Sequence, residues 1–410
     1  MRSRVESFTL LEVLITVGIL AAVSAIAFII VNPNEMIRQG RDAKRLAELD
    51  SLDNAINLSQ MDSSAMSLGT SKIVYISLPD TSSTCASWAS LPALPTGYTY
   101  HCVSSTVLGK TDGTGWIPLN LQGLSTGSPI ASAPTDPVND ALHFYSYITS
   151  GTGAWEFGSV MESAKYKMGG PNDKTSTDGG GNLSLYERGT NLSLMPIDYG
   201  DPSLVGWWRM DETSGSTASD ASGYNGAGSC TGSPTWVAGK CGSALSLSGS
   251  GQYVTVTDTT NSEYDIQGDI TLAAWIKTTS AAVPQVVLSK DNTGTSRSYN
   301  LQTTSGQPKF FLSTSGSTAC GTATGGTPKN DGLWHYIMGV RSGTAMTIYV
   351  DGVSAGTGTC TGNLFVSNIN VLIGATSGGG NAFTGQIDDV RIYNRALSAS
   401  EIQAAYNAMK

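Results

Sequence analysis

The sequence contains few charged residues. Lys, Arg, Asp and Glu together make up 13% of its 410 residues, and the net charge is −9. No cluster of basic residues follows residue 45, so nucleic-acid binding through a broad cationic face is not expected. Glycine is abundant, at 48 residues. Together with frequent Ser, Thr and Asn, this composition indicates a turn-rich, mostly β, surface-exposed protein of two or three domains.

The sequence also lacks recognisable catalytic motifs. It contains no P-loop, nucleophile elbow or HExxH pattern. A retaining glycosidase needs two carboxylates about 5–5.5 Å apart, which on one strand means acids two or four residues apart. Glu212, Glu263 and Glu401 are scattered instead, and His335 has no nucleophile or acid constellation beside it. We therefore expect a protein that is not an enzyme.

No two cysteines have the C-x-x-C spacing of a zinc site or a redox motif. The six cysteines instead form three pairs that are local in the sequence: Cys85 with Cys102, Cys230 with Cys241, and Cys320 with Cys360. For an exported chain, we expect three disulfides formed in an oxidising compartment. Free, buried thiols are the alternative.

The longest apolar run lies near the N-terminus, where residues 13–31 are almost wholly apolar. A helix from Phe8 to Val31 would be about 36 Å long, which is enough to cross a bilayer. Arg2 and Arg4 would stay on the cytoplasmic side. The run could be a plain transmembrane anchor, or a signal peptide cut after Ala25. Neither explains Glu12, because a carboxylate in the hydrocarbon region costs about 2.5–3.5 kcal/mol.

The presence of Glu12 can be explained by the stretch around it, SFTLLEVLI, residues 7–15. It resembles the type IV prepilin signature, in which a short basic leader is cut before a Phe and a Glu is the fifth residue of the mature chain. The resemblance implies cleavage between Ser7 and Phe8 by a prepilin peptidase, and N-methylation of Phe8. It also implies that Glu12 pairs with the Phe amine of a neighbouring subunit during assembly, which compensates for burying both charges. The family usually has Gly where this chain has Ser7.

The helical pattern resumes after Pro33, which should kink or break the helix. An apolar stripe at helical spacing follows, formed by Ala43, Leu46, Leu49, Leu52 and Ile56. We predict a pilin-type helix over residues 8–58, after a leader over residues 1–7. Arg41, Lys44 and Arg45 are expected on its solvated face, with filament contacts as the alternative.

Residues 59–186 contain short strand-like runs punctuated by Pro and Gly and predict a small globular head. The run Asp136 to Asp140 and the aromatic strand after it resemble the C-terminal sheet of major pseudopilins. In that family a glycine-rich loop follows, which can bind calcium. Here that loop would contain Asp173 and Asp178, and a solvated turn is the alternative. Residues 187–203 are predicted to be a linker.

Residues 204–410 are the size of one β-sandwich. Ile270, Leu272, Ala274 and Ile276 alternate onto one strand face. Asp351-Gly352 is a two-residue hairpin signal, and Ser398 to Glu401 is a helix capping box. This region resembles the concanavalin A-like, laminin G-like jelly roll through the segments LVGWWRMDE, GSALSLSGSGQYVTV, ITLAAWIK, DGLWHYIMGV, IYVDG and GQIDDVRIYNRALSASEI. The resemblance implies a two-sheet antiparallel sandwich that binds glycans or proteins, often with a structural calcium ion.

Parity along the last strand suggests where such an ion would lie. Asp388 has the same parity as Val390 and Ile392, which points it toward the core. An inward acid needs partners, so we predict a calcium site formed by Asp220 and Asp388, with Asn225 as a further candidate ligand. Backbone amides are the alternative partners.

Two further groups of residues in this domain have expected roles. Asp389 and Arg391 share a strand face and are expected to form a surface ion pair. Trp275 and Trp334 are expected in the core. Three other tryptophans could lie in the core or stack on a sugar, namely Trp207, Trp208 and Trp236.

These patterns together predict a multidomain α+β protein: a long pilin helix, a small β-sheet head and an all-β concanavalin A-like sandwich. The predicted function is that of a minor or tip subunit of a type IV pilus-like filament that adheres to glycans or surface proteins. Its partners would be prepilin peptidase, other pilin subunits and the assembly machinery. The chain would lie in the inner membrane before assembly and on the cell surface afterwards. The alternative is a structural pseudopilin of a type II secretion or DNA-uptake system.

Overall fold

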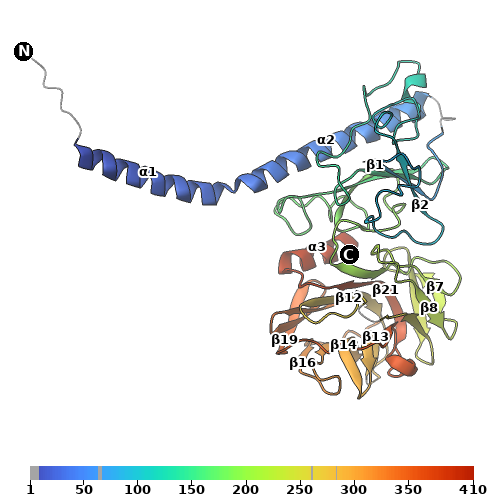
Figure 1. The fold of residues 1–410 in the computed structure, drawn as a ribbon. Coiled ribbons are helices and arrows are strands. Elements are labelled where there is room, and N and C mark those ends of the chain that lie inside the picture. The colour runs from blue at the N-terminus through green and yellow to red at the C-terminus, as the bar shows by residue number, and fades with distance from the viewer. Residues whose placement is uncertain (1–8, 63–66, 260–261, 283) are drawn as a thin grey trace, which may run out of the picture.

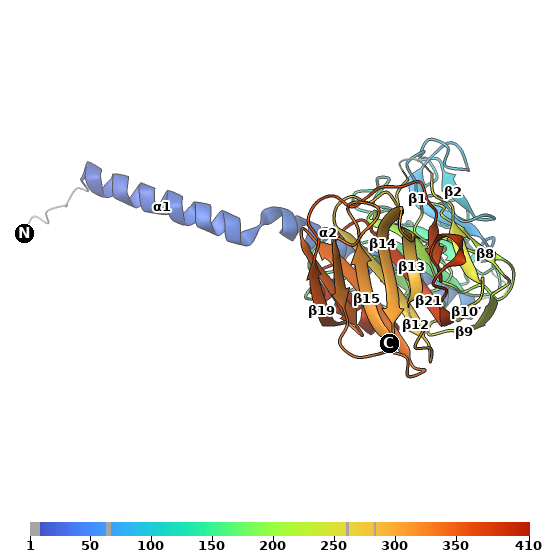
Figure 2. The same ribbon diagram turned by 90° about the horizontal axis from the view of Figure 1, so that it is seen from below.

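The computed structural model describes residues 9–410 except 63–66, 260–261 and 283, and it does not describe the side chains of residues 25–31. The chain forms an N-terminal helical arm, a five-stranded head and a two-sheet sandwich (Figure 1). In both views the first helix projects clear of the head and the sandwich (Figures 1 and 2).

The N-terminal arm is two helices rather than one. Helix α1 spans Leu10–Val31 and helix α2 spans Pro33–Asp62. Between them, Asn32 has the left-handed conformation, with φ of 41°, and Pro33 cannot donate the backbone hydrogen bond that would continue α1. The expected break at Pro33 is confirmed, and the predicted single long helix over residues 8–58 is not found.

The head is a five-stranded sheet with the order β2-β1-β3-β4-β5, and α2 packs against it. Its strands are β1 (Ile73–Pro79), β2 (Thr99–Val103), β3 (Ser146–Thr149), β4 (Trp155–Val160) and β5 (Leu185–Gly189), and a short 3-10 helix, η1, covers Leu121–Gly123. The predicted apolar stripe is buried at Leu49, Leu52 and Ile56. Strand β5 ends at Gly189, so the predicted head boundary at residue 186 falls inside the last strand.

One predicted solvated residue of α2 is buried. Arg45 is fully buried and donates to Asp136 at 2.6 and 2.8 Å and to Asp42 at 2.8 Å. Its Nη1 also lies 2.6 Å from Glu162. Three carboxylates, two of them from distant parts of the chain, thus replace the water that a guanidinium loses on burial. The expectation of a solvated face holds for Lys44, whose side chain is 57% exposed, and is wrong for Arg45.

The C-terminal part is a sandwich of two eight-stranded sheets. The first has the order β19-β18-β17-β12-β21-β10-β9, with β6 paired to β21. The second has the order β16-β15-β14-β13-β20-β11-β8-β7. The first sheet contains β6 (Leu204–Trp208), β9 (Thr235–Ala238), β10 (Ser243–Ser248), β12 (Ile270–Lys277), β17 (Trp334–Ser342), β18 (Ala345–Val350), β19 (Val353–Thr359) and β21 (Thr384–Tyr393). The second contains β7 (Thr217–Ala218), β8 (Gly228–Thr231), β11 (Tyr253–Val256), β13 (Gln285–Asn292), β14 (Ser296–Thr304), β15 (Gln307–Leu312), β16 (Gly321–Thr324) and β20 (Val371–Ile373).

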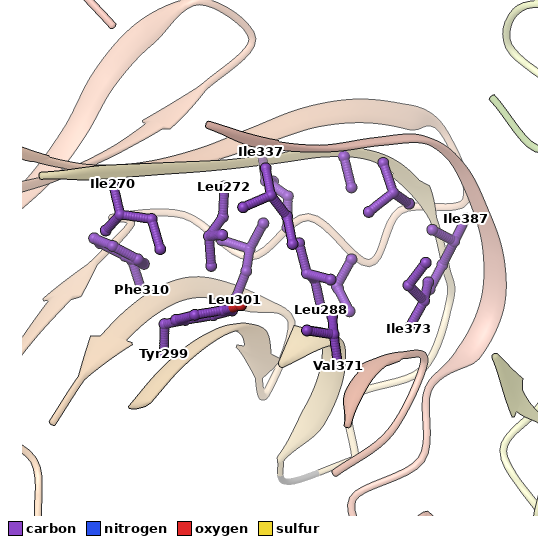
Figure 3. Close-up of a cluster of buried hydrophobic side chains, with 14 of the residues drawn as sticks. Ile270, Leu272, Leu288, Tyr299, Leu301, Phe310, Ile337, Val371, Ile373 and Ile387 are labelled. Carbon is purple, nitrogen blue, oxygen red and sulfur yellow. The ribbon is translucent and has the colours of Figure 1, made fainter. Parts of the chain in front are cut away.

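The sandwich core lies between the two sheets (Figure 3). Ile270 and Leu272 of the first sheet face Leu288 and Tyr299 of the second. All four predicted alternating residues of β12 belong to this core. The opposite face of β12 presents Trp275 to helix α3 (Ala399–Met409), which covers the outer side of the first sheet. Alternate residues of β12 therefore pack in two different apolar layers, one in the sandwich core and one beneath α3.

Local turn and cap signals in the sandwich are confirmed. Asp351 and Gly352 both have positive φ, 52° and 79°, at the β18–β19 hairpin, as its turn requires. Ser398 and Glu401 form the capping box that starts α3. A second 3-10 helix, η2, covers Ser377–Gly379.

Two of the three predicted disulfides form. Cys85 pairs with Cys102 and Cys320 with Cys360, with Cα atoms 5.2 and 5.0 Å apart. The predicted bridge between Cys230 and Cys241 is wrong, since both are free thiols. Cys230 lies on β8 of the second sheet, whereas Cys241 lies between β9 and β10 of the first. Closeness in the sequence therefore does not bring these two cysteines together.

Among the residues that the structure describes, no helix is both long and apolar enough to cross a membrane, so the predicted transmembrane helix is not supported.

Candidate functional site

Two of the predicted N-terminal processing residues, Ser7 and Phe8, lie outside the described residues. Glu12 lies in the first turn of α1, where its carboxylate accepts hydrogen bonds from the Thr9 backbone N and Oγ1, both at 3.0 Å. The Thr9 side chain in turn caps the Glu12 N–H, which completes a capping box. Glu12 therefore has a local structural role within the single chain, and its role in assembly stays a prediction.

The surface of α1 is largely apolar and exposed over residues 10–24, the part whose side chains are described. Leu10, Leu14 and Leu20 are 82%, 65% and 70% exposed. By contrast, four apolar residues in the second half of α2 are buried against the head, namely Leu49, Leu52, Ala55 and Ile56, while Leu58 and Met61 of the same half are exposed. Exposed apolar side chains concentrated on one element indicate a contact surface rather than a folding core.

The predicted metal ligand Asp220 already has protein partners. Its carboxylate accepts bonds from the backbone N–H groups of Trp207 at 3.0 Å, Ser222 at 2.9 Å and Gly226 at 2.8 Å, and from the Ser222 hydroxyl at 2.8 Å. The alternative of an acid satisfied by backbone amides therefore describes Asp220 in this structure. Asn225 lies in the same loop with φ of 62°.

Asp388 does not face the sandwich core as its parity predicted. In the pairing of β21 with β12, Asp388 is opposite Trp275 while Ile387 is opposite Ile276, and the register shifts by one residue just after. Asp389, with φ of 46°, occupies this bulge. Because a bulge reverses side-chain parity along a strand, Asp388 points to the α3 side while Val390 and Ile392 point to the core. The parity argument for a calcium site with Asp220 is therefore wrong.

The buried Asp388 carboxylate is only partly satisfied. Its Oδ2 accepts from Lys240 N at 2.8 Å and Cys241 N at 3.0 Å, and its Oδ1 has no partner. Burial raises the pKa of Asp388 to about 8. Across the described parts of the chain, no group of three or more His, Cys, Asp or Glu side chains is placed to hold a metal ion. Calcium binding by this chain stays a prediction.

The same side of the first sheet carries two arginines stacked on Trp207. The guanidinium carbons of Arg209 and Arg391 lie 4.3 and 4.2 Å from the ring centroid, and the Trp207 Nε1 donates to Asp389 at 2.6 Å. Arg391 pairs with Asp389 at 3.0 Å, and both are buried. The predicted surface ion pair between Asp389 and Arg391 is therefore a buried one.

The two arginines bind the sandwich to the head. Arg209 donates to the Asn182 side chain at 2.7 Å and to the Met195 carbonyl at 3.0 Å, and Arg391 donates to the Gly181 carbonyl at 3.2 Å. No sequence pattern predicts this junction, because the partners of the two arginines are backbone carbonyls and an amide in irregular segments. Head and sandwich therefore share fixed polar contacts.

Two carboxyl groups, those of Glu156 and Glu187, are buried on the head side of this junction, and that of Asp178 is half-buried. Glu156 accepts from Leu194 N at 2.7 Å and Met195 N at 2.8 Å, and Asp178 accepts from Glu187 N at 2.7 Å. Burial and the neighbouring carboxylates raise the pKa of Glu187 well above its usual value. Burial also raises the pKa of Glu156, and it raises that of Asp178 to about 7. Asp178, a residue of the predicted calcium-binding loop, thus accepts a backbone hydrogen bond that holds its loop to β5.

The predicted tryptophans sort clearly by exposure. Trp207, Trp208 and Trp275 are buried, and Trp334 and Trp236 are half-buried. Trp236 donates its Nε1 to the Gly215 carbonyl at 3.0 Å. Sugar stacking on Trp207 or Trp208 is therefore excluded in this conformation.

The second sheet of the sandwich lies on the side away from the head and α3 (Figure 1). On this sheet the Arg297 guanidinium lies 5.1 Å from the Phe311 ring centroid and donates to Asp291 at 3.2 Å. Asn300 also donates to Asp291, at 3.1 Å. This group of Asp291, Arg297, Asn300 and Phe311, the distal cluster, combines one aromatic ring with polar groups.

Comparison with known proteins finds a family match in the C-terminal part. Residues 248–403 match the family model described as the concanavalin A-like lectin/glucanases superfamily. No curated protein sequence matches the chain.

Similar solved structures include the binding domain of Paraclostridial Mosquitocidal Protein 1, with 16% identity and a TM-score of 0.41 over 50% of this chain and 52% of that one. Domain 4 of the arabinanase AbnA from Geobacillus stearothermophilus, in complex with arabinotriose, has 20% identity and a TM-score of 0.40 over 51% of this chain and 98% of that one. The chain thus spans about half the length of the toxin domain and nearly all of the arabinanase domain. With its two antiparallel sheets and the matched family model, the C-terminal part of this chain is a laminin G-like, concanavalin A-like jelly-roll domain.

Proposed function

We propose that this chain is a minor or tip subunit of a type IV pilus-like surface filament that displays a glycan-binding jelly-roll domain. One observation carries the proposal: an exposed apolar helix projects from a body whose largest domain has a lectin-like fold. The apolar helix would pack among helices of other subunits, and the lectin-like domain would remain outside. The polar contacts between head and sandwich support rigid display of that domain.

In this proposal the N-terminal residues serve assembly. Cleavage before Phe8 would free an amine, and Glu12 of a neighbouring subunit would exchange its capping bonds with Thr9 for a bond to that amine. The exchange is chemically reasonable, because a carboxylate pairs more strongly with an ammonium group than with neutral donors.

We also propose binding rather than catalysis for the jelly-roll domain. The family description covers both lectins and glucanases, so the fold alone does not decide between them. The acids considered for catalysis lie in separate elements: Glu401 is in α3, whereas Glu212 and Glu263 lie in loops. A binding role needs only a shaped surface with polar and aromatic groups.

A glycan array probed with the chain from Pro33 onward tests the part of the proposal that concerns glycan binding. This form removes the exposed apolar helix α1 and keeps the head and sandwich together. We expect saturable binding to a limited set of glycans. Absence of binding by a protein that still unfolds cooperatively would contradict the proposal, and would favour a structural pseudopilin in which the sandwich is a spacer.

A further inference from the structure

A hollow of about 420 Å³ lies at the seam between the head and the sandwich. Its walls come from both domains. The head and the segment after it contribute Pro92, Leu142 and Asp201, and the sandwich contributes Gly223 and Tyr224. The volume falls within the range of about 300–1,000 Å³ that is typical of small-ligand sites, which also favour domain boundaries.

The aromatic wall of this hollow is preorganised. The Tyr224 hydroxyl donates to the Pro202 carbonyl at 2.8 Å, which fixes the ring, yet the residue remains 42% exposed. Leu142 on the head side is 64% exposed. A side chain whose position is already held by a hydrogen bond loses little conformational freedom when a ligand binds to it.

The two sides of the hollow are tied together at its rim. Ala93 N donates to the Gly223 carbonyl at 2.8 Å. Gly223 has φ of +85°, and a Cβ at this position would lie 2.8 Å from the Pro92 Cβ. Glycine therefore permits both the backbone conformation and the close approach of the two domains here.

Two carboxylates line the hollow, and both are already held by protein groups. Asp201 is held by Arg395 at 2.7 Å and by Ser203 N at 2.9 Å. Asp198 is held by Ser184 N and Gly200 N, both at 3.0 Å. Asp201 accepts four hydrogen bonds in all, from the Ser203 backbone N and hydroxyl and from two Arg395 nitrogens, which fills its lone pairs. Asp198 is buried. The Ser90 and Tyr224 hydroxyls of the lining are exposed and neutral. Among the described residues that line the hollow, none is Lys, Arg or His.

We infer that this seam hollow is a binding subsite for a neutral sugar. Ring C–H faces of a sugar pack against fixed aromatic rings such as Tyr224, and its hydroxyls can form hydrogen bonds with the exposed hydroxyls of Ser90 and Tyr224. The acid group of a sialic or uronic acid finds no cation in this lining, and the adjacent Arg395 is already paired with Asp201 and Glu401. This inference rests on the proposed function and adds the ligand class and the location of its site.

The distal cluster is the competing location on the sandwich. Its aromatic ring, Phe311, already carries the Arg297 guanidinium, so a sugar would have to displace that contact. In the seam hollow, Tyr224 is exposed without such a cover. The seam subsite also differs in needing both domains, so residues of the head should affect binding.

The test uses the chain from Pro33 onward and arrayed neutral oligosaccharides with sialylated forms of the same glycans. The variants are Tyr224→Ala in the sandwich, Leu142→Ser in the head and Phe311→Ala as the matched control. We expect the unmodified chain to prefer the neutral glycans, and each of the first two variants to lose affinity about tenfold or more, as for an aromatic or apolar anchor. Phe311→Ala should change affinity less than about twofold, since it lies outside the subsite.

The outcomes separate the subsite from the proposed function. Normal binding by Tyr224→Ala and Leu142→Ser, with loss in Phe311→Ala, would overturn the seam subsite and leave glycan binding intact. Stronger binding to the sialylated forms would overturn the neutral-sugar assignment. Absence of binding by the unmodified chain would overturn both proposals. Because Leu142 is largely exposed, its substitution tests the head wall without opening a core.

Discussion

Replacing Arg45 with alanine is expected to lower the free energy of unfolding by about 3–5 kcal/mol, as is typical when one partner of a buried ion pair is removed. The guanidinium is fully buried and contacts Asp42, Asp136 and Glu162 at distances between 2.6 and 2.8 Å. Its loss would leave these carboxylates close together, with no cation between α2 and the head. Urea unfolding of the chain from Pro33 onward measures the effect.

Lys44→Ala is the matched control for this prediction. Lys44 is on the same helix, one residue away, but its side chain is 57% exposed and lies 3.6 Å from Glu48. An exposed pair at this spacing contributes about 0.3–0.5 kcal/mol. If Arg45→Ala and Lys44→Ala shifted stability equally, the buried network would not hold α2 to the head.

Replacing Glu187 with glutamine is expected to stabilise the protein by about 1–3 kcal/mol at pH 8 and to have little effect near pH 4. Burial raises the folded-state pKa of Glu187 well above that of the unfolded chain, so the folded protein binds a proton more tightly. The stability from this proton is fully present below the unfolded pKa, near 4.5, and is lost as the pH rises through the folded pKa. Glutamine mimics the neutral, protonated form of this side chain.

The measurement is the free energy of unfolding at several pH values between 4 and 8. We expect a flatter profile for Glu187→Gln than for the unmodified chain. Glu35→Gln serves as the control, because Glu35 is partly exposed at the start of α2 and should leave the profile unchanged. Identical slopes for the unmodified chain and Glu187→Gln would contradict a protonated carboxyl group at this position.

Local patterns predicted the parts of the fold that depend on neighbouring residues. The alternation in β12, the turn at Asp351-Gly352, the capping box at Ser398 and the break at Pro33 are each determined within a few residues, and all are found. The family resemblance of residues 204–410 added the two-sheet topology, which alternation alone does not specify.

The predictions were wrong where the structure depends on irregular backbone or on contacts between residues that are distant in the sequence. A single bulge residue, Asp389, reversed the orientation of Asp388, and a one-residue shift cannot be read from alternation. Arg45 is buried because Asp136 and Glu162, about a hundred residues away in sequence, supply its partners. The seam hollow was missed for the same reason, since its walls come from segments that only the folded chain brings together.

Mass spectrometry of the N-terminal peptide, from filaments sheared off cells that produce the full chain, tests the central claim most directly. That claim is that this chain joins a surface filament and displays its jelly-roll domain there. We predict a peptide that begins with N-methylated Phe8, recovered from the sheared filaments. A chain that keeps Met1, or one cut after Ala25, and that is missing from the filaments would contradict the claim.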